Sequence, residues 1–164
     1  MDSLPFGIDG YRLIRAGPGD KGYILGCMRE TVISSVPCNE RELCDLWIDD
    51  ILAIVSYDLD TGKMDNEAFI LVSGDRNAGA LWMGKSRDHL TCDDTGYLMG
   101  LFVEKEFRRK GLGTELVRSA EQWCRSNDLL SMTLNVGAVN DAAASLYRKA
   151  GYEPRSIVMK RLLK

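Results

Sequence analysis

Leu98-Met99-Gly100-Leu101-Phe102-Val103-Glu104-Lys105-Glu106-Phe107-Arg108-Arg109-Lys110-Gly111-Leu112-Gly113-Thr114-Glu115 is the stretch that decides the fold of this 164-residue chain. Its apolar first part is typical of a buried strand, and the charged turn that follows leads into two glycines at the start of a helix. The first N–H groups of a helix lack partners within it, and the helix dipole places about half a positive charge there. The stretch therefore predicts a binding site for an anion such as phosphate.

Two glycines and three cations would form this anion site. Gly111 and Gly113 have no Cβ, so a phosphate group could approach their backbone closely. The cations Arg108, Arg109 and Lys110 would neutralise its charge. From these residues alone, an ordinary strand-to-helix turn with a solvated basic patch remains the alternative.

Length and composition limit the classes of protein to consider. The chain has 164 residues, 45% of them hydrophobic, so we expect a single domain over residues 1–164 with a substantial core. Its net charge of -3 gives no indication of nucleic-acid binding. The cations at 105–110 are therefore a local feature of an acidic protein.

The cysteines and the N-terminal segment indicate the cellular compartment. Five cysteines form no C-x-x-C pair and no metal-ligand spacing with His89, the single histidine. We expect reduced thiols and no metal. Residues 1–10 do not resemble a secretion signal, and no apolar run reaches about 18 residues. The expected location is cytoplasmic, without a membrane partner.

Hydrophobic periodicity and turn signals predict the element order β-α-α-β-β-β-α-β-α-β-β, which indicates an α+β fold. Asp20 and Asn39 are predicted to cap the first two helices, and Trp47 is predicted to lie in the core. Polar loops are expected at 57–66, 74–79 and 86–95. Strands are expected at 11–15, 67–73, 80–85, 97–103 and 131–136, with one or two more from 152 onward that include 157–163. Helices are expected at 23–33, 39–55, 111–127 and 140–150.

Other glycine-loop chemistries do not match the chain. A P-loop requires a lysine before the Ser or Thr that follows its last glycine, and Gly113-Thr114 lacks it. A dinucleotide-binding fingerprint requires three glycines early in a parallel sheet, and the pattern fails there as well. Nucleotide hydrolysis and dinucleotide binding are therefore not indicated.

A second motif follows the first by about 30 residues. The first reads Arg108-x-x-Gly111-x-Gly113, and the second reads Asn140-x-x-Ala143-x-x-Leu146-Tyr147-x-Lys149-x-Gly151-Tyr152. With both motifs in this order, residues 97–163 resemble the GNAT superfamily of acyl-CoA-dependent N-acetyltransferases, while the first 96 residues agree only in element order. The resemblance implies a mixed, mostly antiparallel sheet with helices on both faces and a parallel, splayed strand pair at the cofactor wedge.

The resemblance also implies acetyl-CoA as co-substrate and a place for each part of it. The strand at 97–103 would carry a β-bulge and diverge from the strand at 131–136, so that pantetheine bonds the backbone of Leu101 and Val103. The pyrophosphate would lie on the amides of 109–114, and N–H groups near Leu101 and Phe102 would stabilise the oxyanion. The implied cofactor-binding residues are Leu101, Phe102, Val103, Arg108, Arg109, Lys110, Gly111, Leu112, Gly113, Thr114, Asn140, Ala143 and Tyr147.

Tyr147 is the implied catalytic side chain, with its hydroxyl near the CoA sulfur; core packing is the alternative. Because a tyrosine pKa of about 10 exceeds a thiol pKa of about 8.5, we expect hydrogen bonding to the sulfur at least as much as proton donation. The family often has a carboxylate base early on the strand at 97–103, but Tyr97 occupies that position here. The remaining base candidates, each also consistent with a loop or surface residue, are Asp93, Asp94, Glu67 and His89.

The implied function is direct transfer of acetyl from acetyl-CoA to a primary amine of a small molecule, amino acid, peptide or protein. The alternative is a non-catalytic acyl-CoA-binding module, and a larger acyl donor also stays open. The amine acceptor should contact the first two helices and the loops at 57–66 and 86–95, where Asp58, Asp60, Asp93 and Asp94 would attract a cation. The resemblance makes a homodimer a weak further expectation.

Overall fold

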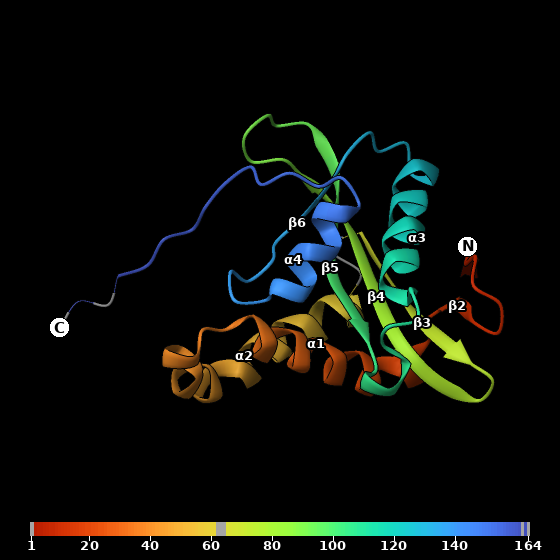
Figure 1. The fold of residues 1–164 in the computed structure, drawn as a ribbon, viewed down its shortest axis with the longest axis horizontal. Helices are drawn as coiled ribbons and strands as arrows, with labels where there is room; N and C mark the ends of the chain where they lie inside the picture. The colour runs from red at the N-terminus through yellow and green to blue at the C-terminus, as the bar shows by residue number, and fades with distance from the viewer. Residues whose placement is uncertain (1, 62–64, 162, 164) are drawn as a thin grey trace.

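The computed structural model describes residues 2–61, 65–161 and 163 (Figure 1). In the helix at 41–61 it does not describe the side chains of 43–47, 51, 54 and 58. The predictions for Trp47 and Asp58 therefore lie outside the described residues.

One six-stranded sheet runs through the described residues in chain order, β1 to β6. Neighbouring strands are antiparallel except for β5 and β6, which are parallel. This confirms the predicted α+β fold with a mostly antiparallel mixed sheet. The strands are β1 (Ser3–Leu4), β2 (Arg12–Arg15), β3 (Asn66–Ser73), β4 (Arg76–Arg87), β5 (Asp94–Val103) and β6 (Met132–Leu134).

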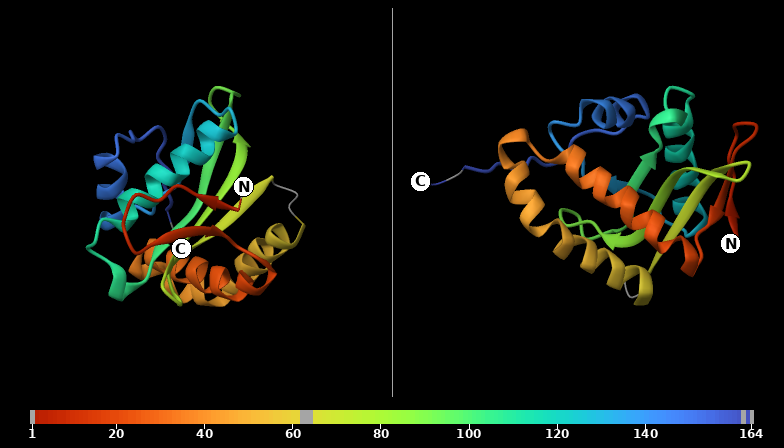
Figure 2. Two further views of the ribbon diagram at one scale, coloured as in Figure 1. Left: turned by 90° about the vertical axis from the view of Figure 1, so that its right-hand side faces the viewer. Right: turned by 90° about the horizontal axis from the view of Figure 1, so that it is seen from below.

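Helices cover both faces of the sheet, as predicted (Figure 2). On one face, buried residues of α1 (Lys21–Ser35) pack against Ala80 and Trp82 of β4, and α2 (Arg41–Thr61) lies beside α1. On the other face, α3 (Leu112–Ser126) and α4 (Asp141–Lys149) lie over Leu81 and Met83. Side chains alternate along β4, so successive residues contribute to two separate cores. Three short 3₁₀ turns complete the elements: η1 (Pro18–Asp20), η2 (Cys38–Glu40) and η3 (Lys105–Phe107).

Three predicted loops are wrong or too long. The loop at 57–66 is wrong because α2 continues to Thr61, where Leu59 extends the stripe that packs on the α1 side. The predicted loop at 86–95 is too long, because β4 runs to Arg87 and β5 begins at Asp94, which leaves residues 88–93 between the strands. In the predicted loop at 74–79, the strands enclose only two residues, since Ser73 pairs with Arg76.

The predicted helix starts also need correction. Asp20 does occupy the N-cap position of α1, as predicted, but its carboxylate accepts a hydrogen bond from the Gly17 amide at 2.8 Å and makes no capping bond to the helix. Asn39 lies inside η2, so α2 begins at Arg41. Local turns compete with capping at both places, because a short polar side chain can bond either set of amides.

The C-terminal strands are the largest error. Residues 152–161 and 163 form no strand, and Ile157, Val158 and Met159 are exposed. Pro154 cannot donate to a strand ladder, and the neighbouring β6 offers only three residues instead of the predicted six. The chain after α4 consequently runs away from the body of the molecule (Figure 1). Across the described ranges, we find no helix both long and apolar enough to cross a membrane.

Candidate functional site

A β-bulge interrupts β5 at Met99, in the strand for which the resemblance implied one. Leu98 pairs with Met83 and Gly100 pairs with Trp82, so Met99 is an extra residue without a partner on β4. Met99 packs on the α1 side, and a Cβ at Gly100 would lie 2.4 Å from the Met28 Cε on α1. Two consecutive residues thus face the same side, which is the usual consequence of a bulge.

Beyond the bulge, β5 has one open edge. Its parallel pairing with β6 ends at Leu98 and Leu134. The Glu104 amide donates a hydrogen bond to the carbonyl of Ala78 in β4 at 2.9 Å. Because backbone groups alternate along a strand, the amides of Leu101 and Val103 face the open edge and that of Phe102 faces β4. This alternation favours Leu101 over Phe102 as the oxyanion donor.

The turn from β5 into α3 brings amide groups to this open edge. Arg109 and Gly111 both take left-handed conformations, with φ of 65° and 79°. The first bond of the helix joins the Glu115 amide to the Gly111 carbonyl at 3.1 Å, so the amides of residues 112–114 precede the hydrogen-bonded ladder. Thr114 is exposed on this first turn. The local backbone therefore has the free donors that an anion requires.

Two of the predicted cations already contact the protein. Arg108 Nε donates to the Val103 carbonyl at 2.8 Å, and its guanidinium lies 5.7 Å from the centre of the Phe102 ring. Lys110 Nζ lies 5.2 Å from the Phe107 ring centre. Both side chains remain exposed, as does Arg109. The turn is therefore held in shape by its own cations while their charge stays at the surface.

Helix α4 packs closely against the start of α3. A Cβ at Gly113 would lie 3.3 Å from Leu146 Cδ2, so glycine allows the close approach. Asn140 begins α4, and its side chain accepts a hydrogen bond from the Ala143 amide at 3.1 Å. Asparagine is one of the residues preferred at this N-cap position. The first turn of α3, which follows β5 in the chain, is thus held against α4.

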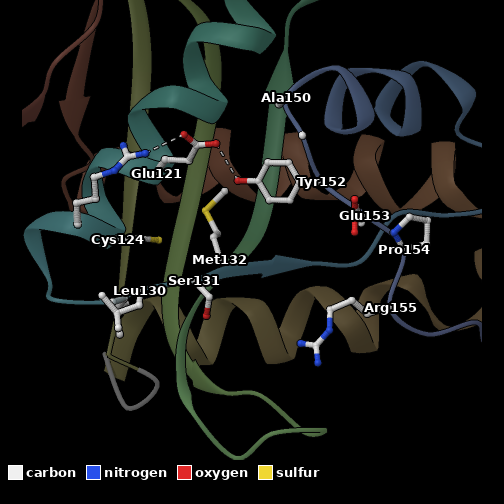
Figure 3. A pocket seen from close by; sticks show the side chains of 13 residues that line it. Glu121, Cys124, Leu130, Ser131, Met132, Ala150, Tyr152, Glu153, Pro154 and Arg155 are labelled. Carbon is white, nitrogen blue, oxygen red and sulfur yellow. Dashed lines mark hydrogen bonds and ion pairs between the residues drawn. The ribbon is translucent and has the colours of Figure 1, made fainter.

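Tyr147 of α4 is partly buried against the core on the α3 side. Its ring meets the Tyr152 ring edge-on with centroids 6.0 Å apart. Figure 3 shows the Tyr152 hydroxyl, which donates to Glu121 at 3.2 Å. Burial raises the pKa of Tyr147 to about 12. The phenol is therefore neutral at physiological pH, with a proton available to donate.

A cavity of about 580 Å³ reaches from Tyr147 around β6 to Tyr97 of β5. The end of α1, the turn between β4 and β5, the loop after β6 and residues 152–156 also line it. Inside it, Asn135 Nδ2 donates to the Tyr97 hydroxyl at 2.8 Å. No local sequence pattern indicates Asn135, because its partner Tyr97 lies 38 positions earlier in the chain.

The four predicted base candidates are dispersed. His89 lines the cavity. Asp93 and Asp94 are exposed, and Asp94 pairs with Arg87 at 3.7 Å. Glu67 lies elsewhere: it accepts from Trp123 Nε1 at 3.1 Å and pairs with Arg15 at 3.4 Å.

A second cavity, of about 600 Å³, lies near the end of α3 and contains no predicted site residue (Figure 3). Cys124 is one of its lining residues, and burial raises the pKa of this thiol to about 11. The thiol is therefore protonated and a poor nucleophile at neutral pH. This cavity offers less catalytic chemistry than the one beside Tyr147.

Comparison with known proteins gives consistent matches. Residues 22–152 match a sequence model described as the acetyltransferase (GNAT) family. The uncharacterized N-acetyltransferase YobR of Bacillus subtilis is 29% identical over 121 residues, which cover 71% of this chain and 49% of that protein. The chain thus spans about half the length of this curated relative.

Two solved structures share the fold. A putative acetyl transferase from Pyrococcus furiosus has a TM-score of 0.74 and 20% identity, covering 93% of this chain and 99% of that one. The aminoglycoside N-acetyltransferase AAC(6')-Iy, solved in complex with CoA, has a TM-score of 0.69 and 15% identity, covering 94% and 95%.

Proposed function

This chain belongs to the GNAT acetyltransferase family, and from that membership we propose that it transfers an acetyl group from acetyl-CoA to a primary amine. The observation that carries the proposal is the open edge of β5 beside the free amides of α3. Parallel pairing with β6 stops at Leu98, which leaves an unpaired edge over the next residues. The CoA complex of AAC(6')-Iy, a protein of the same fold, is consistent with it.

The residues present fit a CoA molecule. The amides of Leu101 and Val103 face the open edge and would bond a pantetheine arm laid along it. The amides of 109–114 would bind the pyrophosphate, because Gly111 and Gly113 carry no side chain there and the dipole of α3 favours an anion. Bound acetyl-CoA supplies the activated thioester.

The protein groups then have separate tasks. We assign the Leu101 amide to the thioester oxygen, where a well-placed donor is worth about 2.7–4 kcal/mol in other enzymes. The Tyr147 hydroxyl donates to the departing sulfur, since its neutral form is retained well above neutral pH. Of the four base candidates, His89 is the one found among the described residues that line the cavity.

A non-catalytic acyl-CoA-binding module is the second candidate function. It is favoured by the placement of the carboxylates, because Glu67, Asp93 and Asp94 do not line the described part of the cavity. Both candidates bind CoA through the same residues. They differ only in turnover.

Two measurements on the purified chain test the proposal. Calorimetric titration with acetyl-CoA should show one site, and a thiol reagent should detect CoA release that depends on an added amine. Absence of acetyl-CoA binding would contradict both candidates. Binding without amine-dependent release, over a panel of amines, amino acids and peptides, would support the module.

A further inference from the structure

The Tyr97 and Asn135 side chains form a polar pair at the acceptor end of the cavity. Leu98 and Leu134 pack on the α3 side of the sheet, so their neighbours Tyr97 and Asn135 face the α1 side. Tyr147 lies in the α3-side core and lines the same cavity. A thioester near Tyr147 would therefore face an amine that enters beside Tyr97.

This pair offers one hydrogen-bond donor and one acceptor. With Asn135 Nδ2 donating to the Tyr97 oxygen, the Tyr97 O–H is free to donate and the Asn135 Oδ1 is free to accept. Exchanging the amide oxygen and nitrogen keeps this balance, because Nδ2 then donates and the phenol oxygen accepts. A ligand that satisfies both groups of the pair has an N–H for the free acceptor and, next to it, a carbonyl oxygen for the free donor.

The charges of the cavity do not suit a polycation. Arg87, Arg148 and Arg155 line it, against the carboxylates of Asp88 and Glu153. Asp88 is buried, and its carboxylate already has partners within the protein. It accepts hydrogen bonds from the amides of Leu90 and Thr91 and pairs with Arg155. Those amides, with Arg155, hold its pKa below the usual range. The described lining is therefore weakly cationic overall.

The proton balance points to the same ligand. A peptide α-amino group has a pKa of about 7.7–8.0, against about 10.4 for a lysine, so its neutral fraction at pH 7 is roughly 300-fold larger. Such an amine needs no strong base. In the transfer, the amine nitrogen bonds the acetyl carbon as the C–S bond breaks. One proton of the ammonium form goes to solvent and a second ends on the CoA thiol.

We propose that the acceptor is the N-terminal α-amino group of a peptide or protein, and that Tyr97 and Asn135 determine this specificity by bonding the first amine and carbonyl. The proposal rests on the proposed acetyl transfer. It assigns recognition to neutral hydrogen bonds and to the low pKa of the amine.

The test compares acceptors at fixed, saturating acetyl-CoA. The acceptors are a lysine-free tripeptide with a free N-terminus, free alanine, an N-blocked peptide with one lysine, butylamine and spermidine. The tripeptide should have the highest kcat/KM, and its kcat/KM should rise with pH and level off above about pH 8. A higher kcat/KM for alanine, spermidine or the lysine peptide would overturn the proposal.

The variants Tyr97→Phe and Asn135→Ala test the assigned residues. Each should raise the KM for the tripeptide about tenfold and the KM for butylamine less, because butylamine has no carbonyl for the pair to bond. Tyr11→Phe is the matched control, because it removes the same hydroxyl from a ring that contacts Phe6 and Phe107 instead.

Acetyl-CoA titration of each variant distinguishes a wrong assignment of Tyr97 and Asn135 from a wrong proposed function. Unchanged acetyl-CoA affinity with an unchanged tripeptide KM would refute the role of the pair while the acetyl transfer stands. Loss of binding in the wild-type chain itself would remove the proposed function and this inference together.

Discussion

The β5–α3 turn and the C-terminal segment, residues 150–161, are held by different forces. Along β5, backbone pairing with β4 continues from Asp94 to Val103. After Pro154, side-chain pairs carry the attachment: Arg155 with Asp88, and Lys160 with Glu40. Backbone geometry thus shapes the side that we assign to CoA, whereas side chains shape the acceptor side. Changes in one region should therefore leave the other nearly unaffected.

The largest expected effect comes from Thr114→Asp. The new carboxylate would lie on the first turn of α3, where it suits the helix dipole but repels a pyrophosphate. At about 5 Å and an effective dielectric of about 20, two like charges repel by roughly 3 kcal/mol, so the Kd for CoA should rise about 100-fold. Titration calorimetry measures this change.

Thr114→Asn is the control for that variant, because it has nearly the same shape without the charge. Its CoA affinity should stay within about threefold of wild type, and the thermal stability of both variants should stay close to that of wild type, since Thr114 is exposed. Equal CoA affinities for the Asp and Asn variants would show that the pyrophosphate binds elsewhere.

Tyr147→Phe should act on turnover rather than on binding. Removing the hydroxyl takes away the donor assigned to the sulfur, so kcat should fall about 10- to 100-fold with the CoA Kd unchanged. The comparison variant is Tyr152→Phe, which loses only the bond to Glu121 and keeps the edge-on ring contact. Wild-type kcat for the Tyr147 variant, measured with its own acceptor, would rule out the assignment.

Burial of Tyr147 also predicts a dependence of stability on alkaline pH. Its pKa is raised to about 12 in the folded chain, above about 10 for an exposed tyrosine. The stability from burying the neutral phenol is complete below pH 10 and is lost as pH rises toward 12, because only the unfolded chain ionises in that window. Denaturant unfolding should show a smaller stability loss from pH 10 to 12 for Tyr147→Phe than for wild type; equal losses would contradict the burial.

The smallest effect is expected for Arg155→Ala, on the acceptor side. Asp88 keeps the amides of Leu90 and Thr91, so the β4–β5 turn should persist. Acetyl-CoA affinity should be unchanged, and KM for the acceptor should change by about threefold or less. A large loss of CoA binding would show that the two regions are not independent.

The elements of the side that we assign to CoA could be predicted because their signals are local. An apolar run, two glycines and an amphipathic helix lie within thirty residues, and β5, the bulge and α3 all form as expected. The acceptor side depends on long-range contacts. The Tyr97–Asn135 and Asp88–Arg155 pairs join residues 38 and 67 apart, and no periodic pattern indicates them.

The C-terminal segment shows a different limit. Ile157 to Leu163 have the composition of a strand, but a strand forms only where a neighbour can pair with it. Pro154 and the three-residue β6 leave little ladder to extend. Likewise, α2 extends past Leu59 because Leu59 packs against the core on the α1 side. The acidic composition of 57–66 had instead indicated a loop.

Amide hydrogen exchange, measured with and without acetyl-CoA, tests the central assignment most directly. With acetyl-CoA bound, we expect slower amide exchange in the segments 100–104 and 109–115, because the bound molecule would cover the amides of Leu101, Val103 and the first turn of α3. The segments 121–132 and 150–155, which border the second cavity, should be unchanged. Protection confined to those two segments, with 100–104 and 109–115 unaffected, would contradict it.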